Sequence, residues 1–457
     1  MTDRFSSKSA HGRNGRARKP GNPNARPTTA RPKSARQVAL TLLGAVMDKH
    51  LAVDDACFGN RDFADLSDRD KSFAKLLVLT VARHMGQMNA LIDRLLQEPP
   101  EGDKGQVRRI LQLGLAQLVY LKTPAHAAVG QTVELAGRKP LFRYKGVVNA
   151  ILRRVDREGD ALFDDLSDPK LNVRPWAWKS WEAAYGETTA RAIATAHVAG
   201  ATLDLTVKDD ADDWAETLGA DRLPTGSLRL PAGTAVPGLE GYKAGHWWVQ
   251  DAAAALPVKL LGDVTGKTVI DLCAAPGGKT MQLIAAGASV TAVDRHGGRL
   301  KRLQANLDRV GQRAQVVEAD AETWRPEKPA DIVLLDAPCT ATGTIRRHPE
   351  LQWIRSPNDV KELAELQRKL LLASLDMVRP GGEILYVTCS LQPEEGEAQI
   401  AGLLDAVVEL SLKPFVKADL PGLEEAITDH GYLRCLPSYW AEKGGMDGFF
   451  AARLIRK

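Results

Sequence analysis

The sequence predicts an α/β protein with a doubly wound parallel sheet in residues 251–457, preceded by an all-helical domain at 37–155 and a small α/β linking domain at 156–250. Beyond residue 251, apolar strands without polar alternation are separated by amphipathic helices, which is typical of a parallel sheet covered on both faces. Before residue 155, apolar residues recur at helical spacing and no strand pattern is found. A chain of 457 residues also has room for roughly three domains.

Five apolar segments predict the strands of the sheet, at 267–273, 289–294, 314–320, 331–336 and 383–388. A helical stretch over 360–378 carries leucines on one face. Pro380-Gly381-Gly382 is expected to end that helix before the next strand begins. Residues 449–455 are expected to supply a final strand.

The helical domain is predicted from several apolar stripes, such as the one that contains Val38, Leu42 and Val46. Ser67 is placed to cap a helix, because its hydroxyl can accept a hydrogen bond from a free backbone N–H. Further helices are expected at 125–136, after Pro124, and at 146–155. The domain has no cluster of His, Cys and acidic residues, so we expect it to dock or bind RNA rather than to catalyse.

The linking domain contains a short helical segment that is rich in aromatic residues and ends at Gly186: Trp176, Trp178, Trp181 and Tyr185. Aromatic residues at this spacing form a core more often than a platform for stacking bases, so we expect a core. Residues 203–207 are predicted to form a strand.

The net charge of the chain is +4, but it is unevenly distributed. Residues 1–36 hold ten Lys or Arg against the single acid Asp3, which gives them +9 and leaves −5 for the other residues. The segment has almost no large apolar residues and is expected to be disordered. A solvated tail and an arm attracted to phosphate backbones are both compatible with it.

The five cysteines are far apart and form no C-x-x-C pair: Cys57, Cys273, Cys339, Cys389 and Cys435. This argues against a disulfide framework or a zinc module and favours a reducing compartment, the cytoplasm. The chain has no apolar run long enough to cross a membrane and no secretory signal, so no membrane partner is expected. No coiled-coil pattern is visible, and a monomer is expected.

The ends of the first three strands carry small or acidic residues, and ligands bind beyond such ends in a parallel sheet. The segment Asp271 to Thr280 resembles a phosphate loop, but Cys273 stands where that loop needs its first glycine, and a dinucleotide fingerprint is also absent. Asp294 is placed to hold the hydroxyls of a ribose, and Asp320 to meet an adenine edge. Recognition of a nucleoside without a phosphate site favours S-adenosylmethionine.

The ends of the fourth and fifth strands each carry a cysteine, in Asp336-Ala-Pro-Cys339 and Thr388-Cys-Ser390. A lone cysteine is most often a small buried apolar residue. Two cysteines at neighbouring ligand-facing ends instead favour a thiolate nucleophile for an electron-poor ring. The residues alone do not decide which cysteine attacks.

These segments, with Asp271-Leu-Cys-Ala-Ala-Pro-Gly-Gly-Lys-Thr280, resemble the signature of the RNA cytosine-5 methyltransferases over residues 240–457. The phrases Arg346-Arg-His-Pro-Glu350 with Trp353, and Val249-Gln-Asp-Ala252, add to the likeness. The helical part resembles a NusB-like RNA-binding domain through Thr123-Pro-Ala-His126, Val133-Glu-Leu135 and Val148-Asn-Ala-Ile-Leu-Arg153. One departure is Cys339-Thr-Ala-Thr, where the family usually has Cys-Ser-Gly-Thr.

The resemblance implies a Rossmann-like class I methyltransferase domain and C5 methylation of a cytosine in RNA, most specifically 16S ribosomal RNA. It assigns attack at C6 to Cys389 and resolution of the covalent adduct to Cys339, and it places Asp336 at the N3/N4 edge of the base. It implies that S-adenosylmethionine is held by Cys273, Ala274, Ala275, Pro276, Gly277, Gly278, Lys279, Asp294, Asp320 and Asp336. No metal is expected.

Three alternatives stay open at this point. The substrate can be transfer RNA or another ribosomal site, because the motifs do not discriminate between RNAs. The helical domain by itself would also fit a non-catalytic RNA-binding factor. A DNA cytosine methylase fits less well, because that group is expected to attack with the cysteine of Pro-Cys and would not need Cys389.

Overall fold

The computed structural model describes residues 33–96, 105–137 and 139–457, and residues 34–457 form one compact unit. The predicted basic tail lies almost wholly outside the described residues. The first helix begins at Ala35, two residues before the predicted start of the helical domain. Ser34 explains this start, because its hydroxyl accepts from Gln37 N and the Gln37 side chain accepts from Ser34 N in a capping box.

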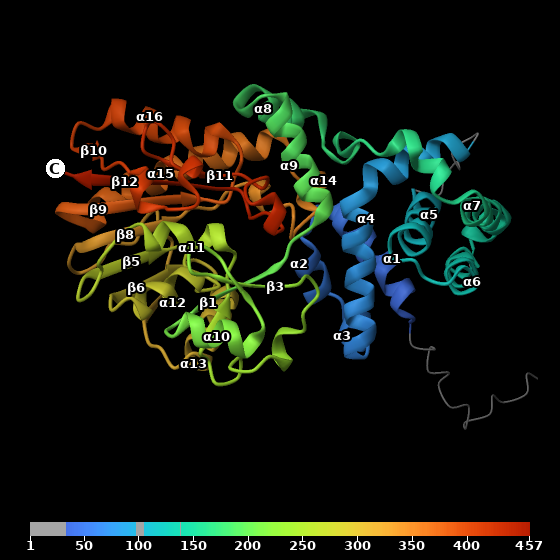
Figure 1. The fold of residues 1–457 in the computed structure, drawn as a ribbon, viewed down its shortest axis with the longest axis horizontal. Coiled ribbons are helices and arrows are strands. Elements are labelled where there is room, and N and C mark those ends of the chain that lie inside the picture. The colour runs from blue at the N-terminus through green and yellow to red at the C-terminus, as the bar shows by residue number, and fades with distance from the viewer. Residues whose placement is uncertain (1–32, 97–104, 138) are drawn as a thin grey trace, which may run out of the picture. The chain divides into compact units, whose positions relative to one another are not determined.

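The part from α1 to α7 is helical, as the apolar stripes predict, and its helices are coloured blue to teal-green in Figure 1. Ser67 caps the long helix α4 by accepting from Asp70 N, and α6 begins directly after Pro124. The elements are α1 (Ala35–Lys49), α2 (Val53–Phe58), α3 (Arg61–Ala64), α4 (Asp68–Leu95), α5 (Gln106–Leu115), η1 (Ala116–Tyr120), α6 (Ala125–Leu135), η2 (Leu141–Tyr144) and α7 (Lys145–Glu158).

The linking part combines the three helices α8, α9 and α10 with a small antiparallel sheet of order β2-β3-β1-β4. Trp178 and Trp181 are buried, which confirms the core role predicted for them. The Arg229 guanidinium forms a buried bidentate ion pair with Asp204 in this sheet. The elements are η3 (Gly159–Leu166), η4 (Pro169–Asn172), α8 (Pro175–Tyr185), α9 (Glu187–Ala199), β1 (Leu203–Val207), α10 (Ala211–Leu218), β2 (Asp221–Arg222), β3 (Leu228–Leu230), η5 (Val236–Gly238) and β4 (Trp247–Val249).

The C-terminal part is the doubly wound sheet, with strand order β10-β12-β9-β8-β5-β6-β7. Apolar residues of α11, α12 and α13 pack on one face, and those of α15 and α16 pack on the other. The helices are α11 (Ala252–Lys259), α12 (Gly278–Ala285), α13 (Gly297–Arg309), α14 (Leu351–Ile354), α15 (Pro357–Met377) and α16 (Glu397–Ala406). The strands are β5 (Thr268–Leu272), β6 (Ser289–Asp294), β7 (Gln315–Glu318), β8 (Ala330–Asp336), β9 (Val378–Thr388), β10 (Leu410–Leu412), β11 (Leu433–Cys435) and β12 (Phe449–Arg456).

The remaining short turns of this part are η6 (Thr342–Thr344), η7 (Pro393–Glu395), η8 (Lys417–Asp419), η9 (Glu424–Ala426) and η10 (Ala441–Lys443). Only η6 and η7 bear on the site described below, because they follow the two strands that carry the site cysteines.

The sheet is mixed rather than wholly parallel. The final strand forms as predicted, but β12 runs antiparallel to β9, and β10 and β11 run antiparallel to β12. Residues Phe449 to Ala452 and Leu454 are buried on both faces, so apart from Arg453 the strand β12 has the same apolar pattern as a parallel strand. The pattern therefore predicts the strand without predicting its direction.

Helix α15 ends at Met377, just ahead of Pro380-Gly381-Gly382, as predicted. The segment does not lie before the next strand, however, because β9 already pairs with β8 at Val378. Ala330 of β8 pairs with Val378, and Ile332 pairs with Glu383. The extra β9 residues between these pairs, which include Pro-Gly-Gly, form a bulge inside the strand. A Cβ at Gly382 would lie 2.8 Å from the Asp331 carbonyl oxygen, which explains why glycine stands there.

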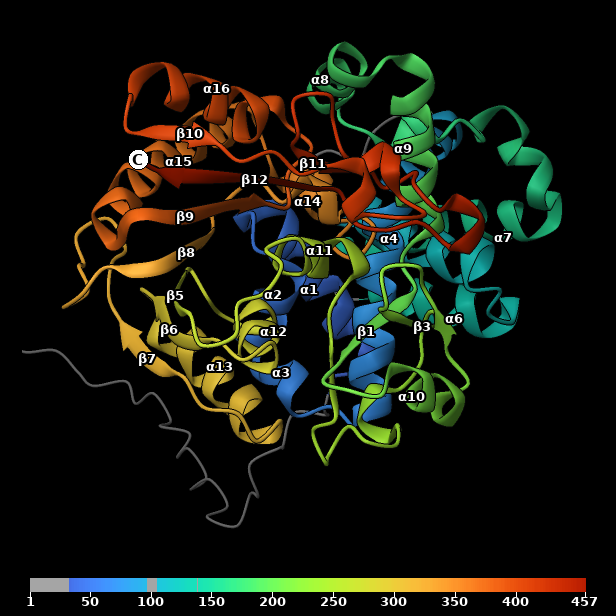
Figure 2. The same ribbon diagram turned by 60° about the vertical axis from the view of Figure 1, so that its left-hand side comes forward.

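The C-terminal and helical parts share one hydrophobic core around α14. Buried residues of α1, α4 and α5 belong to the same apolar cluster as Ile345, Leu351 and Leu391 of the C-terminal part. The Trp353 indole donates to the Ala82 carbonyl oxygen at 2.6 Å, and Glu350 Oε1 accepts from Val53 N at 3.1 Å. Figures 1 and 2 show α14 next to the blue helices from two directions.

Among the described residues, none of the helices combines the length and the apolar character needed to span a bilayer. In the same ranges, no group of three or more His, Cys, Asp or Glu side chains is arranged to hold a metal ion.

Candidate active site

Two cysteines meet at the carboxyl edge of the sheet. Cys339 lies in the loop after β8, and Cys389 follows β9 directly; the two strands are parallel neighbours, as predicted. Their Sγ atoms are 3.5 Å apart, and both residues are partly accessible to solvent. Two thiols within contact distance at the mouth of a sheet can act together on one substrate atom.

The environment of Cys339 favours its protonated form. The hydrogen bond to Cys389 is the largest cause that raises the pKa of the Cys339 thiol, and burial raises it further. The pKa of Cys339 therefore lies well above its usual value, and this thiol keeps its proton at neutral pH. A protonated Cys339 can donate a hydrogen bond to the Cys389 sulfur 3.5 Å away, although either thiol can be the donor of this contact.

The loop between β5 and α12 turns sharply beside these cysteines. Cys273 and Gly277 both have positive φ angles, of 60° and 102°. A Cβ at Gly277 would lie 3.1 Å from Leu303 Cγ, so glycine suits this close approach. Lys279 Nζ forms an ion pair of 2.8 Å with Asp336 Oδ2, which links the loop to the end of β8.

Asp294, at the end of β6, is buried and firmly held. Its Oδ1 accepts from His296 N at 3.0 Å, and its Oδ2 accepts from Ala275 N at 3.3 Å and pairs with Arg299 Nη1 at 3.2 Å. Asp320 differs, because β7 ends at Glu318 and leaves Asp320 in an exposed loop. There Asp320 Oδ1 accepts from Glu322 N at 2.9 Å.

A pocket runs along these strand ends and contains three of the predicted cofactor residues. It is lined by Cys273, Val293, Asp294, Arg295, His296, Arg299, Ala319, Asp320, Ala321, Pro338, Leu366 and Leu370. The carboxylates can accept hydrogen bonds from hydroxyl and amino groups of a ligand, and the apolar residues can pack against a flat ring. A buried orphan atom, Asp271 Oδ1, lies under the same loop and has no hydrogen-bond partner among the described residues. This donor set fits S-adenosylmethionine, a nucleoside that also carries an ammonium group.

Asp271 lies near the end of β5, directly before this loop. It is fully buried, its Oδ2 accepts from Thr280 Oγ1 at 2.5 Å, and burial raises its pKa to about 7. Thus the carboxyl group is readily protonated near neutral pH when no cofactor is bound.

Asp271→Asn is expected to flatten the dependence of stability on pH. Between the ordinary pKa of 3.8 and the folded value of about 7, the unfolded chain releases a proton that the folded chain keeps. The contribution of Asp271 to the free energy of unfolding is therefore fully present below the ordinary pKa. It falls as the pH rises toward the folded value, by up to about 1.4 kcal/mol per pH unit. Urea unfolding of the cofactor-free protein across this pH range measures the slope. Exposed Asp308→Asn is the control, and an identical slope in wild type and Asp271→Asn would contradict the prediction.

Some residues of the site were not predicted. Glu395 and Gln367 are fully buried beneath the cysteine loops, and Glu395 accepts hydrogen bonds from both loops. Arg347 Nη2 pairs with Asp447 Oδ2 at 2.5 Å beside Cys389. The sequence offers one indication of Glu395. It lies five residues after Ser390, in a Pro-Glu-Glu-Gly turn that follows the predicted Thr388-Cys-Ser390 site.

The departure from the family pattern lies in the turn after Cys339. Ala341, which stands where the family usually has glycine, has a φ of 57°. An L-residue pays roughly 1–2 kcal/mol for this left-handed conformation. The Ala341 carbonyl oxygen accepts from Thr344 N and Thr344 Oγ1, both at 2.9 Å, and these bonds hold the turn.

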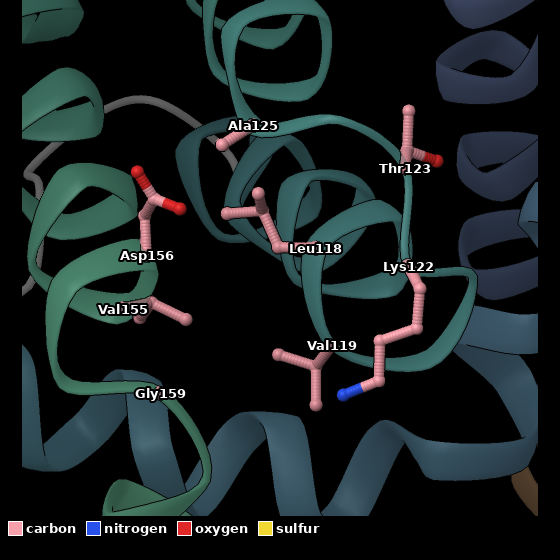
Figure 3. Close-up of a pocket in the computed structure, with 8 residues that line it drawn as sticks. All are labelled: Leu118, Val119, Lys122, Thr123, Ala125, Val155, Asp156 and Gly159. Atoms are coloured by element: carbon pink, nitrogen blue, oxygen red, sulfur yellow. The ribbon is translucent and has the colours of Figure 1, made fainter.

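A separate pocket lies in the helical part (Figure 3). Its apolar wall contains Leu118, Val119 and Val155, and the side chains of Lys122 and Asp156 lie on opposite sides of it. This pocket contains none of the predicted site residues, so the chemistry belongs to the edge of the sheet.

Comparison with known proteins agrees with this geometry. Residues 258–455 match the family model described as 16S rRNA methyltransferase RsmB/F, and residues 33–157 match the NusB family. Ribosomal RNA small subunit methyltransferase B of Cronobacter sakazakii is 36% identical over 86% of this chain and 92% of that protein.

Two solved structures share the fold. The crystal structure of PH0851 is 22% identical and covers 93% of this chain and 99% of its own, with a TM-score of 0.72. The structure of NSun6 from Pyrococcus horikoshii with SFG is 18% identical and covers 62% of this chain and 98% of its own, with a TM-score of 0.53. On the sequence matches, this chain belongs to the RsmB/F family of 16S rRNA methyltransferases, enzymes that take their methyl group from S-adenosylmethionine.

Proposed function

We propose that this enzyme methylates C5 of a cytosine in 16S ribosomal RNA through a covalent bond between Cys389 Sγ and C6 of the base. The observation that carries the proposal is the 3.5 Å separation of the Cys339 and Cys389 sulfurs. They lie at the ends of β8 and β9, and β8 also pairs with β5, which leads into the cofactor loop. One thiol is available to attack C6, and the second can return a proton to the sulfur when it leaves.

The proposed reaction begins at Cys389. Its thiolate bonds to C6 and moves the electrons of the C5–C6 double bond to C5, which becomes nucleophilic. Bound S-adenosylmethionine supplies an electrophilic methyl group. A base then removes the C5 proton, the electrons of that C–H bond restore the double bond, and the Cys389 sulfur leaves. Cys339 keeps its proton and contacts this sulfur, so it can return a proton to the leaving thiolate.

Asp336 is proposed to orient the base. Its carboxylate ends β8, is about one-third exposed and lies three residues before Cys339. An oxygen there can accept from the N4 amino group of cytosine. The ion pair with Lys279 balances the charge of this carboxylate. Because the target carbon lies within a stacked base in a helix, the cytosine must be unpaired or flipped out.

The cofactor is proposed to bind along the loop from Cys273 to Lys279. Backbone N–H groups at the start of α12, together with Lys279, would meet its carboxylate, and Asp271 would meet its ammonium group. Asp294 would hold the ribose hydroxyls, and Asp320 would meet the adenine edge.

Asp294→Ala is expected to weaken binding of S-adenosylmethionine by about 10- to 100-fold, since hydrogen bonds to a charged acceptor are lost. Isothermal titration calorimetry with the cofactor measures the change. Asp308→Ala, on the exposed side of α13, is the control and should bind as wild type. An unchanged affinity in Asp294→Ala would remove this residue from the site.

We propose that the chain is divided into a basic tail (1–36), a NusB-like RNA-binding domain (37–155), a linking domain (156–250) and a methyltransferase domain (251–457). We propose that it acts as a monomer in the cytoplasm. The basic tail is compatible with attraction to RNA.

Bisulfite mapping tests the function. Ribosomal and transfer RNA from cells with and without the protein are treated and sequenced, and a cytosine in 16S RNA is expected to lose its protection in the deletion strain. Restoring the gene should restore protection, whereas a Cys389→Ala copy should not. Loss of protection in transfer RNA alone would replace the proposed substrate, and no change in any RNA would contradict the proposed reaction.

A further inference from the structure

One buried carboxylate joins the two cysteine loops. Thr340, which follows Cys339, donates its backbone N–H to Glu395 Oε1 at 2.9 Å. Ser390, which follows Cys389, donates its hydroxyl to Glu395 Oε2 at 2.5 Å. The Thr340 hydroxyl also donates to Oε2. The residue next to each cysteine is thus bonded to the same side chain.

The carboxylate of Glu395 is held by neutral donors alone. Glu395, Thr340, Ser390 and Gln367 are all fully buried, and no Lys, Arg or His among the described residues lies within ion-pair distance of Glu395. Burial raises its pKa, while the bonds from Ser390 and Thr340 oppose that rise. Burying a carboxylate without a cation costs free energy unless all its oxygens are hydrogen-bonded. The four hydrogen bonds to Glu395 therefore hold it in one position.

Glu395 is itself fixed by β9 and α15. Its carbonyl oxygen accepts from Tyr386 Oη at 2.9 Å and from Thr388 Oγ1 at 3.1 Å. Gln367 Nε2 donates to Glu395 Oε1 at 3.0 Å and to the Pro338 carbonyl oxygen at 2.8 Å. The carboxylate is therefore a rigid reference point, and both cysteine loops are attached to it.

We propose that Glu395 is a positioning residue that sets the separation of the Cys339 and Cys389 sulfurs. The inference rests on the proposed function for its catalytic consequence, because that reaction needs both sulfurs at one base. The loops have no other shared charged anchor among the described residues. A displacement of about 1 Å in such a pair is enough to cost roughly 100-fold in rate.

The first test measures the separation directly. Diamide takes one hydrogen from each of two thiols and leaves a disulfide, so the rate of Cys339–Cys389 disulfide formation reports how often the sulfurs meet. Glu395→Gln keeps the shape of the side chain but turns one oxygen into an NH₂ group that faces donors. The disulfide, followed by peptide mass spectrometry, is expected to form about tenfold more slowly in this variant. The exposed neighbour variant Glu394→Gln should match wild type.

The second test measures catalysis. Glu395→Gln is expected to lower kcat by about 100-fold, while the dissociation constants for S-adenosylmethionine and RNA stay within about twofold. An unchanged disulfide rate or an unchanged kcat in the folded variant would overturn the proposal. Loss of cofactor affinity in parallel with kcat would also overturn it, because Glu395 would then support the whole pocket. A slowed disulfide in an enzyme whose wild type methylates no cytosine would instead overturn the proposed function.

If Glu395→Gln does not fold, variants of Thr340 test the same hydrogen bond from its other end. Thr340→Val removes one hydroxyl bond to Glu395 and should slow both the disulfide and kcat. Thr340→Ser keeps the hydroxyl and should restore both to the wild-type values. Equal behaviour of the two variants would show that the bond to Glu395 does not set the separation.

Discussion

Cys389→Ala is expected to abolish methyl transfer, with a loss of about 10⁴-fold or more, as found when a covalent nucleophile is removed from other enzymes. Without this thiolate no bond forms at C6, and C5 keeps too little electron density to accept a methyl group. Transfer of tritiated methyl from S-adenosylmethionine to 16S RNA measures the loss.

The fold should tolerate this change. The Cys389 sulfur is partly exposed, and the backbone around it is held by Gly343 N, which donates to the Cys389 carbonyl oxygen at 2.9 Å. Cys57→Ala, in helix α2, serves as the control for loss of a cysteine. Activity within tenfold of wild type in Cys389→Ala would show that the attack is made elsewhere.

Cys339→Ala is expected to trap the reaction rather than prevent it. Cys389 can still attack C6, but the thiol that contacts the leaving sulfur is gone, so release of the methylated base stalls. A protein–RNA species that survives denaturation should accumulate and be visible by gel electrophoresis with labelled RNA. Turnover should fall by about 100-fold or more, the size of effect typical of a lost acid–base group.

The double variant provides the control for this second prediction. Cys339→Ala combined with Cys389→Ala should form no stable adduct, since the attacking sulfur is absent. If Cys389→Ala instead accumulates the adduct and Cys339→Ala forms none, the roles of the two cysteines are reversed.

The sequence predicts much of the fold because unbroken apolar strands are easy to recognise. Strand 289–294 has the predicted bounds, and the cysteines at the ends of β8 and β9 come together because neighbouring parallel strands end at one edge. Strand direction was missed at β12, because a strand buried on both faces looks the same in either direction. The bulge at Pro380 was missed because proline and glycine also mark helix ends.

Glu395 shows why part of the site could not be predicted. Its function depends on donors from residues 340, 367 and 390, which are distant in the sequence from one another. A lone glutamate in a polar turn is usually solvent-exposed, and only the packed structure reveals that it is buried. Family membership, in turn, removes the alternative of a non-catalytic RNA-binding factor.

The two segments that match family models, 33–157 and 258–455, are far apart in the sequence. They are nevertheless not independent folding units. Ile345, Leu351 and Leu391 come from the later segment, yet their neighbours include side chains contributed by the earlier one. Removing either segment would expose this apolar surface to solvent on the other, and one of the exposed residues, Leu391, lies two positions from Cys389. Fusing the C-terminal segment to a different RNA-binding domain would therefore require redesigning this shared apolar interface first.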